Sequence, residues 1–379
     1  MAQRIKTDWL LFSTVVAMVF FGLVMVYSAS QFMAEMKKLP GTWFLARQAG
    51  FAAVAFIALM YFKRKDYRSL SAPTWAFAPL GIVLALLLVV YAADTRAHRW
   101  LQIGAFSLQP SEFAKPALAI FLAWFVTRRI HAINTKHTLL PAAMALSVLA
   151  LCVVVADLGT AAVLLVTAAV VFFVAGLDRR FLLIAMGVCL LAVPVAILSK
   201  PYRLARVIKF VDPDGTLLEK IDKQGRLKEM SKRSVSTTDA GYQVKQSLIA
   251  VGSGGPVGVG LMQGKQKLLY LPEAHNDFIF AIVGEEMGLF GALAVLAGYL
   301  VIILRGGQLF CNVGDDFGRY LALGLSVVIV SQALMNISVV LDLAPTKGFP
   351  LPMISYGGSS LLSSLASMGI LMSVSEHAG

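Results

Sequence analysis

The sequence predicts an all-α polytopic membrane protein with about ten transmembrane helices, and composition, run length and charge placement each point to this class. Of the 379 residues, 58% are hydrophobic and only 14% are charged, and the mean hydropathy is +0.76. The apolar residues gather in runs of about 20, the length of helix that crosses a hydrocarbon core about 30 Å thick. A soluble protein of this length needs far more charged surface, so a soluble fold is excluded.

Ten apolar runs are predicted to be membrane helices. The first follows a short basic leader, but it is longer than the apolar region of a cleavable signal peptide, so we expect it to be retained. The predicted helices cover about 9–31, 43–62, 74–92, 110–126, 139–155, 158–176, 181–199, 278–303, 319–341 and 352–374. We expect a single membrane domain over 1–379, with one large loop at about 200–277 between helices seven and eight.

Lysine and arginine in the short loops predict that both termini are cytoplasmic. The inner segments then carry Arg4, Lys6, Lys63, Arg64, Lys65, Arg68, Arg128, Arg129, Lys136, Arg179, Arg180, Arg305 and Arg319, against Lys37, Lys38, Arg96, Arg99 and Lys347 outside. Because positive charge is enriched in cytoplasmic loops, the large loop is expected on the outer side. It is itself basic, in a chain of net charge +12, and this indicates an anionic partner outside the cell.

Familiar soluble-enzyme motifs do not fit this chain. Cys152, Cys189 and Cys311 lie far apart without CxxC pairing, so we expect them to pack as small hydrophobic residues. The glycine-rich run GSGGPVGVGLMQGK (252–265) does not match a nucleotide-binding P-loop, since Gln266 follows the lysine. A turn-rich loop is favoured for this run, with a backbone nest for phosphate as the alternative.

Ionisable residues at helix ends are the remaining candidates for function. PSEFAKP (110–116) places Glu112 and Lys115 three residues apart on one helix face. Each charge would cost about 2.5–3.5 kcal/mol at the bilayer centre. The two either pair near the outer helix end or bind an anionic head group. Asp157 in ADLGT either favours the N-terminal dipole of the next helix or serves the site.

The stretch LPEAHNDFIFAIVGEEMG (271–288) places Asp277 at the outer mouth of the eighth predicted helix. On one continuous helix, Glu285 and Glu286 would lie about 12 Å deeper, at 1.5 Å rise per residue. Residues 277, 281, 284 and 288 would then share a small-residue face suited to close helix packing. Asp277 is either a helix cap or a catalytic base, and its chemistry alone leaves both open.

Five segments resemble, in order, the SEDS family of bacterial cell-wall polymerases. They are HRWLQIGAFSLQPSEFAKPALAIFLAWF, ADLGTA, GYQVKQSLIAVGSGG, QKLLYLPEAHNDFIFAIVGEEMG and PTKGFPLPMISYGGSSLL. The last two are more similar to the division branch of the family (FtsW) than to the elongation branch (RodA). Two departures stand out: Ala156 replaces a usual proline before the DLGT-type aspartate, and the stretch 215–240 is longer than expected.

The resemblance implies a peptidoglycan glycosyltransferase that polymerises lipid II on the outer face of the membrane, for septal synthesis. It assigns Asp277 as the catalytic residue, Trp100 as a functional loop residue, and Glu112 with Lys115 as the charged pair of a central cavity. Alone, Trp100 fits an interfacial belt better than a sugar-stacking role. The substrate-binding residues expected are Arg99, Trp100, Glu112, Lys115, Asp157, His275, Lys347, Ser355 and Ser359.

The resemblance also carries expectations about partners and cofactors. We expect a class B penicillin-binding transpeptidase, other division proteins and membrane lipid as partners, no nucleic acid, and a place in the bacterial cytoplasmic membrane at the septum. A divalent cation, Mg²⁺ or Mn²⁺, is considered for the pyrophosphate, with no ligands assigned. The alternatives are a RodA-like polymerase, a lipid II transporter (flippase), which the lack of an internal repeat disfavours, and an inactive scaffold.

Overall fold

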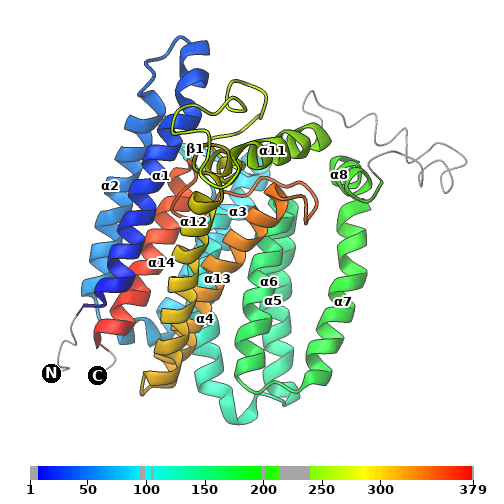
Figure 1. Ribbon diagram of the computed structural model, residues 1–379. Helices are drawn as coiled ribbons and strands as arrows, with labels where there is room; N and C mark the ends of the chain where they lie inside the picture. The colour runs from blue at the N-terminus through cyan, green and yellow to red at the C-terminus, as the bar shows by residue number, and fades with distance from the viewer. Residues whose placement is uncertain (1–6, 94–98, 104–105, 199–200, 213–239, 378–379) are drawn as a thin grey trace, which may run out of the picture.

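The computed structural model describes residues 7–93, 99–103, 106–198, 201–212 and 240–377, which form a bundle of long helices (Figure 1). The elements are α1 (Trp9–Met36), α2 (Trp43–Arg64), α3 (Pro73–Ala93), β1 (Leu101–Ile103), β2 (Phe106–Leu108), α4 (Pro110–Arg129), α5 (Lys136–Ala156), α6 (Leu158–Val174), α7 (Arg179–Leu198), α8 (Pro201–Val211), α11 (Ala240–Gly254), α12 (Ile279–Asn312), α13 (Asp316–Val340) and α14 (Gly358–His377), with 3-10 turns at Tyr67–Ser71 and Ile130–Ala132. The strands pair antiparallel, with Leu101 opposite Leu108.

Each of the ten predicted membrane helices corresponds to a helix of the structure, α1 to α7 and α12 to α14. Within the described ranges, 8 helices are long and apolar enough to cross a membrane, and α6 is a shorter apolar helix. The tenth, α4, carries Glu112 and Lys115 near its start and two arginines at its end, which lower its hydropathy. The sequence did not predict α8, α11 or the β1–β2 hairpin, which belong to the connections outside the bundle.

Two predicted boundaries are wrong in ways that affect the site. The last helix begins at Gly358 rather than at 352, because Met353, in the turn before it, has a φ of 66° that no right-handed helix accommodates. The eighth helix continues to Asn312 and is broken at Gly288, whose φ of 63° is not helical. Asp277 lies before this helix, so the single face running from 277 to 288 and the depth of about 12 Å do not apply.

The break in α12 explains the glycine-rich run. The carbonyl oxygens of Glu285 and Glu286 accept hydrogen bonds from Val259 and Gly260, at 3.0 Å each. On the other side of the break, Leu289 and Phe290 donate to the carbonyl oxygens of 255 and 256, at 2.9 and 3.2 Å. The loop therefore satisfies the backbone groups that the break leaves without helical partners. The turn-rich interpretation of 252–265 is the one the geometry supports.

Three helices form the centre of the bundle. Most of α4, α13 and α14 is buried, including Leu118, Leu321, Leu365 and Met368. In contrast, no residue of α7 is buried, and this helix stands apart from the centre in Figure 1. Helix α7 thus contributes little to the packed core of the described chain.

The two ends of the bundle differ as the charge pattern predicted. Both termini lie at one end, and α8, α11 and the hairpin lie at the other (Figure 1). The large loop is therefore on the side opposite the termini. The stretch 215–240 lies almost entirely outside the described residues, and the description of the chain as one domain stays a prediction.

Candidate active site

Asp157 is the centre of a charged cluster at the end of the bundle opposite the termini. It is the N-cap of α6, and its Oδ1 accepts from the backbone N–H groups of Gly159 and Thr160, at 2.9 and 3.1 Å. Its side chain is buried and forms ion pairs with Arg99 (2.8 Å) and Lys347. Burial acts to raise the pKa of Asp157, but Lys347 and Arg99 outweigh it and hold this pKa well below its usual range. Asp157 therefore both caps the helix and pairs with two cations, whose charge it neutralises in part.

Further cations reach this cluster from the connection after α7. Arg203, on the amphipathic helix α8, donates to the carbonyl oxygens of Val154 (2.6 Å) and Ala196 (3.1 Å), which lie near the ends of α5 and α7. One turn further, Arg206 donates to the carbonyl oxygen of Thr346 at 3.4 Å. Helix α8 thus places positive charge beside the segment that carries Lys347.

Asp277 lies next to this cluster and is not a helix cap. Phe278 is the N-cap of α12 and makes no side-chain cap bond. The Asp277 carboxylate, half-buried, forms no hydrogen bond or ion pair with the described part of the chain, and it lies so close to Gly348 that any side chain there would overlap it. Burial raises the pKa of Asp277 to about 7, although Arg99 acts to lower it. This leaves an unpaired carboxylate near its midpoint at neutral pH.

Asn336 of α13 fixes the backbone on both sides of this contact. Its Nδ2 donates to the carbonyl oxygens of Asp277 (2.7 Å) and Phe349 (2.5 Å). One turn earlier, Gln332 donates to the carbonyl oxygen of Pro350 at 2.8 Å. The segment from Pro345 to Gly357 is therefore the hub at which the parts of the site meet.

The pair Glu112–Lys115 forms as predicted and connects to the same hub. Lys115 Nζ lies 2.6 Å from Glu112 Oε2, and both side chains are buried near the start of α4. Lys115 also donates to the side chain of Gln332, which in turn holds Pro350. The pair is thus linked, through one glutamine, to the segment that contacts Asp277.

The other predicted residues lie around this hub with different exposure. Trp100 is 41% exposed at the start of the hairpin, next to Arg99. His275 is buried. The centroid of its ring lies 5.0 Å from that of Phe44 and 5.6 Å from that of Tyr356. Burial lowers its pKa, so the imidazole is mainly neutral at neutral pH.

Two predicted serines join chain segments. Ser355 Oγ donates to the carbonyl oxygen of Asn276 at 2.6 Å and accepts from the N–H of Leu351 at 2.7 Å. Ser359 Oγ accepts from the N–H of Gln109 at 3.1 Å, which ties α14 to the start of α4. Direct contact of His275, Ser355 and Ser359 with substrate stays a prediction.

The sequence analysis did not identify Gln332, Asn336 or Arg206. Gln332 and Asn336 are spaced four residues apart in an apolar helix, so they lie on one face, and polar residues in a membrane helix usually face the interior. That spacing could have identified both residues from the sequence. Arg206 was harder to identify, since it is one of many basic residues in the outer loop.

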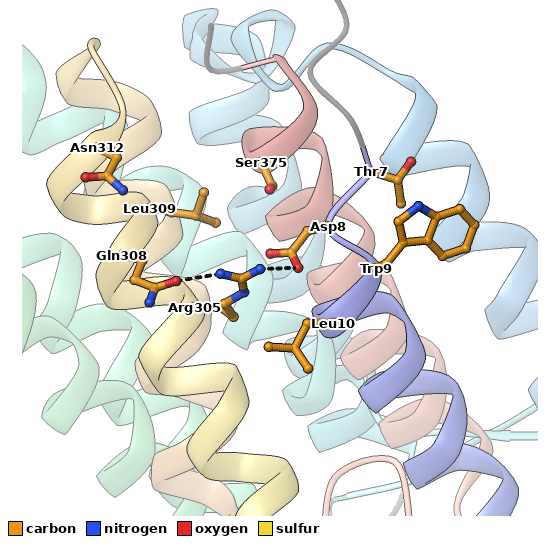
Figure 2. Close-up of a pocket in the computed structure, with 9 residues that line it drawn as sticks. All are labelled: Thr7, Asp8, Trp9, Leu10, Arg305, Gln308, Leu309, Asn312 and Ser375. Carbon is orange, nitrogen blue, oxygen red and sulfur yellow. Dashed lines mark hydrogen bonds and ion pairs between the residues drawn. The ribbon is translucent and has the colours of Figure 1, made fainter.

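Neither a group of metal ligands nor the cavity drawn in Figure 2 lies at this cluster. In the described ranges, no group of three or more His, Cys, Asp or Glu side chains is placed to hold a metal ion. A cavity of about 360 Å³ lies at the terminal end of the bundle, where Arg305 joins Asp8 (2.8 Å) and Gln308 (2.7 Å) (Figure 2). The contact with Asp8 joins the start of α1 to the C-terminal part of α12, far from Asp277.

Comparison with known proteins places this arrangement in a family. The family model described as "Cell cycle protein" (FtsW/RodA/SpoVE) matches residues 8–379. The chain is 36% identical to the "Probable peptidoglycan glycosyltransferase FtsW" of Geobacter sulfurreducens, over 98% of this chain and 96% of that protein. It is 34% identical to the "Stage V sporulation protein E" of Bacillus subtilis, over 99% of this chain and 98% of that protein.

Solved structures agree with the sequence comparisons. A chain from "Structural coordination of polymerization and crosslinking by a peptidoglycan synthase complex" superimposes with a TM-score of 0.75 at 28% identity, over 98% of both chains. The rod shape determining protein RodA of Thermus thermophilus has the same fold, with a TM-score of 0.67 at 24% identity over 99% of both chains. On these matches, which span almost its whole length, the chain belongs to the FtsW/RodA/SpoVE family of cell cycle proteins.

Proposed function

We propose that the protein is a peptidoglycan glycosyltransferase that polymerises lipid II on the outer face of the bacterial cytoplasmic membrane, with Asp277 as its general base. The observation that carries this proposal is the Asp277 carboxylate, which is half-buried, unpaired in the described chain, and near enough to Arg99 and Arg206 for both to act on its pKa. The relatives named as peptidoglycan glycosyltransferases support the same activity.

The geometry suits attack by a sugar hydroxyl on an anomeric carbon. Asp277 would take the proton from the 4-hydroxyl of the acceptor sugar as its oxygen bonds to C1 of the donor. The bond from C1 to the polyprenyl pyrophosphate breaks at the same time, and the pyrophosphate leaves with the electron pair. A base with a pKa near the working pH is well matched to this step and contributes about 10²–10⁴-fold.

The cations beside Asp277 are suited to the leaving group. Arg99, Lys347 and Arg206 lie on three separate segments that meet at the outer end, and Asp157 neutralises part of their charge. These cationic groups would stabilise the pyrophosphate as it departs. A guanidinium group can donate two parallel hydrogen bonds to a phosphate, which also orients the ligand.

The lipid-linked substrate is expected to enter from the bilayer. Helix α7 has no buried residue, so the side of the bundle between α6 and α7 is loosely packed. The buried pair Glu112–Lys115 lies within the bundle behind the hub, where a polar head group would need charged partners.

No set of protein ligands is proposed for Mg²⁺ or Mn²⁺. Both oxygens of Asp157 are taken by cations, so Asp277 is the carboxylate of the cluster that a pyrophosphate-bound cation would meet. Such a cation would supply charge stabilisation to the leaving group.

Division is the cellular role we infer, with a class B penicillin-binding transpeptidase as partner. The FtsW names of the curated relatives support the septal role, and the peptidoglycan synthase complex among the structural neighbours supports a partnered enzyme. Co-purification from membranes and mid-cell localisation would test these two assignments, and loss of cell shape without a division defect would favour the elongation role instead.

Polymerisation of purified lipid II is the direct test of the activity. The chain, purified with its cognate transpeptidase, is expected to produce glycan strands whose length is read on gels. Transport of lipid II across vesicles without strand formation would contradict the proposal and favour the flippase alternative.

A further inference from the structure

The segment that carries Asp277 is fixed at its C-terminal end. Besides the bond from Asn336, Ser355 binds the carbonyl oxygen of Asn276 at 2.6 Å, and the N–H of Tyr356 donates to the carbonyl oxygen of His275 at 3.1 Å. Three successive residues are thus held by α13 and the hub. These bonds set the position of the backbone at Asp277 but not the path by which the chain reaches it.

The N-terminal end of the segment is fixed by a buried ion pair. Lys267 Nζ lies 2.6 Å from Glu286 Oε1, and the side chains are only 7% and 0% exposed. Ser28 of α1 completes the group, because its Oγ lies 2.8 Å from Lys267 Nζ and 2.7 Å from Glu286 Oε2. The N–H of Met262 also donates to this carboxylate at 3.1 Å. One residue of the loop is thereby tied to two transmembrane helices.

The neighbouring Glu285 holds the same loop through its backbone. Its Oε1 accepts from the N–H groups of Lys265 and Gln266, at 2.7 and 3.2 Å. The two glutamates that stand inside the apolar run of α12 therefore serve the loop before it. They lie just before the break at Gly288, where the loop backbone also replaces helical hydrogen bonds.

The chain between the two attachments is strained and has room to move. Leu269 and Glu273 both have positive φ angles, of 70° and 57°, which residues with a side chain rarely adopt. Such conformations persist only where the surrounding structure enforces them. A cavity of about 170 Å³, lined by Ala29, Met33 and the segment itself, lies beside this stretch. Loss of one attachment would let the segment relax.

Energetics argue against stability as the main role of the ion pair. A buried ion pair seldom stabilises a fold more than well-packed apolar side chains of the same size would, because both charges lose their hydration. What such a pair does provide is one defined geometry. In this chain the geometry that it defines is that of the segment leading to Asp277.

We propose that Lys267 is a positioning residue, which through Glu286 and Ser28 holds the segment 267–277 so that the Asp277 carboxylate meets the acceptor hydroxyl. The inference rests on the proposed function of Asp277 and adds to it a residue ten positions away that touches no substrate. A displacement of about 1 Å at a reacting group costs about a hundredfold in rate. Lys267 is therefore expected to affect turnover rather than substrate binding.

The test compares matched variants of the full chain with its transpeptidase. Lys267→Met removes the charge and keeps the length of the side chain, Lys267→Arg keeps the charge, and the double variant Lys267→Met/Glu286→Gln removes both charges. Lys265→Met is the control, because Lys265 is exposed and two residues away. Measurements are kcat and KM for lipid II, melting temperature, and hydrogen exchange of the peptide covering 268–277.

We expect Lys267→Met to lower kcat at least about tenfold with KM within about twofold, and to speed exchange of 268–277. Lys265→Met should match the wild type, and Lys267→Arg should recover part of kcat. The double variant should regain the melting temperature but not kcat. A double variant with wild-type kcat and protected exchange would overturn the inference, since the pair would then serve folding alone.

The same measurements separate this inference from the proposed function. An active wild type with an inactive Asp277→Asn variant supports the function whatever Lys267 does. An inactive wild type would contradict the function, and hydrogen exchange would still decide whether Lys267 holds the segment: unchanged exchange in Lys267→Met overturns the inference.

Discussion

Asp277 is the residue on which the proposed chemistry depends, and Asp277→Asn tests it with little change of shape. Asparagine keeps the size of the side chain but cannot accept a proton. Because Asp277 does not cap α12 and forms no ion pair with the residues that the structure describes, we expect normal membrane abundance and melting temperature. Polymerisation of lipid II should fall by at least about a hundredfold, as expected for loss of a general base. A variant that polymerises at near wild-type rate would show that the base is another group.

The pKa of Asp277 also predicts the pH dependence of the reaction. Burial raises this pKa to about 7, so only the deprotonated form present above that pH acts as base. The rate should therefore rise with pH through about 7 and fall about tenfold for each unit below it. Of the charged groups that face Asp277, Arg99 and Arg206 lower its pKa, and Glu273 and Asp157 raise it.

The variant Glu273→Gln tests the direction in which a nearby charge shifts the pKa of Asp277. Removing the negative charge of Glu273 should lower the pKa of Asp277, so the acidic limb of the kcat profile should move to lower pH. Because Glu273 is exposed, the shift should shrink at high salt. If the acidic limb moves to higher pH, or persists in the Asp277→Asn variant, the limb reports the titration of another group.

The pair Glu112–Lys115 allows folding and function to be separated. Lys115→Met alone leaves the Glu112 carboxylate buried without its partner, which costs about 3–5 kcal/mol of stability. The double change Glu112→Gln/Lys115→Met removes both charges and should restore most of the melting temperature. If the pair binds the head group, this double variant folds but loses activity. A stable, fully active double variant would show that the pair is dispensable.

At the scale of elements, the helices were predictable and their connections were not. Most of the membrane helices are predicted by a run of about 20 apolar residues, a signal that lies within the helix itself. The break at Gly288 has no such signal, because its backbone groups are satisfied by residues about 30 positions earlier. The pairing of Lys347 with Asp157 likewise joins residues from opposite halves of the chain. The resemblance identified Asp277, but only the fold shows what surrounds it.

The contact between α11 and α12 predicts different effects for two nearby glycines. A side chain on Gly254 would overlap the carbonyl oxygen of Gly284, whereas Gly252 faces open space. We expect Gly254→Ala to destabilise the protein by about 1–3 kcal/mol through overpacking, and to impair activity because the loop before Asp277 shifts. Gly252→Ala should have little effect or stabilise α11 slightly. Equal melting temperatures for the two variants would contradict the contact.

At the scale of the whole molecule, the function requires that the Asp277 end face outward. The native Cys311, exposed near the terminal end, and an engineered Tyr242→Cys in α11, at the opposite end, report on the two sides. With Cys152 and Cys189 replaced by alanine, an impermeant thiol reagent should label position 242 in intact spheroplasts and Cys311 only after permeabilisation. The basic loops at the terminal end favour this orientation. The reverse pattern would place Asp277 in the cytoplasm, where outward polymerisation of lipid II could not occur.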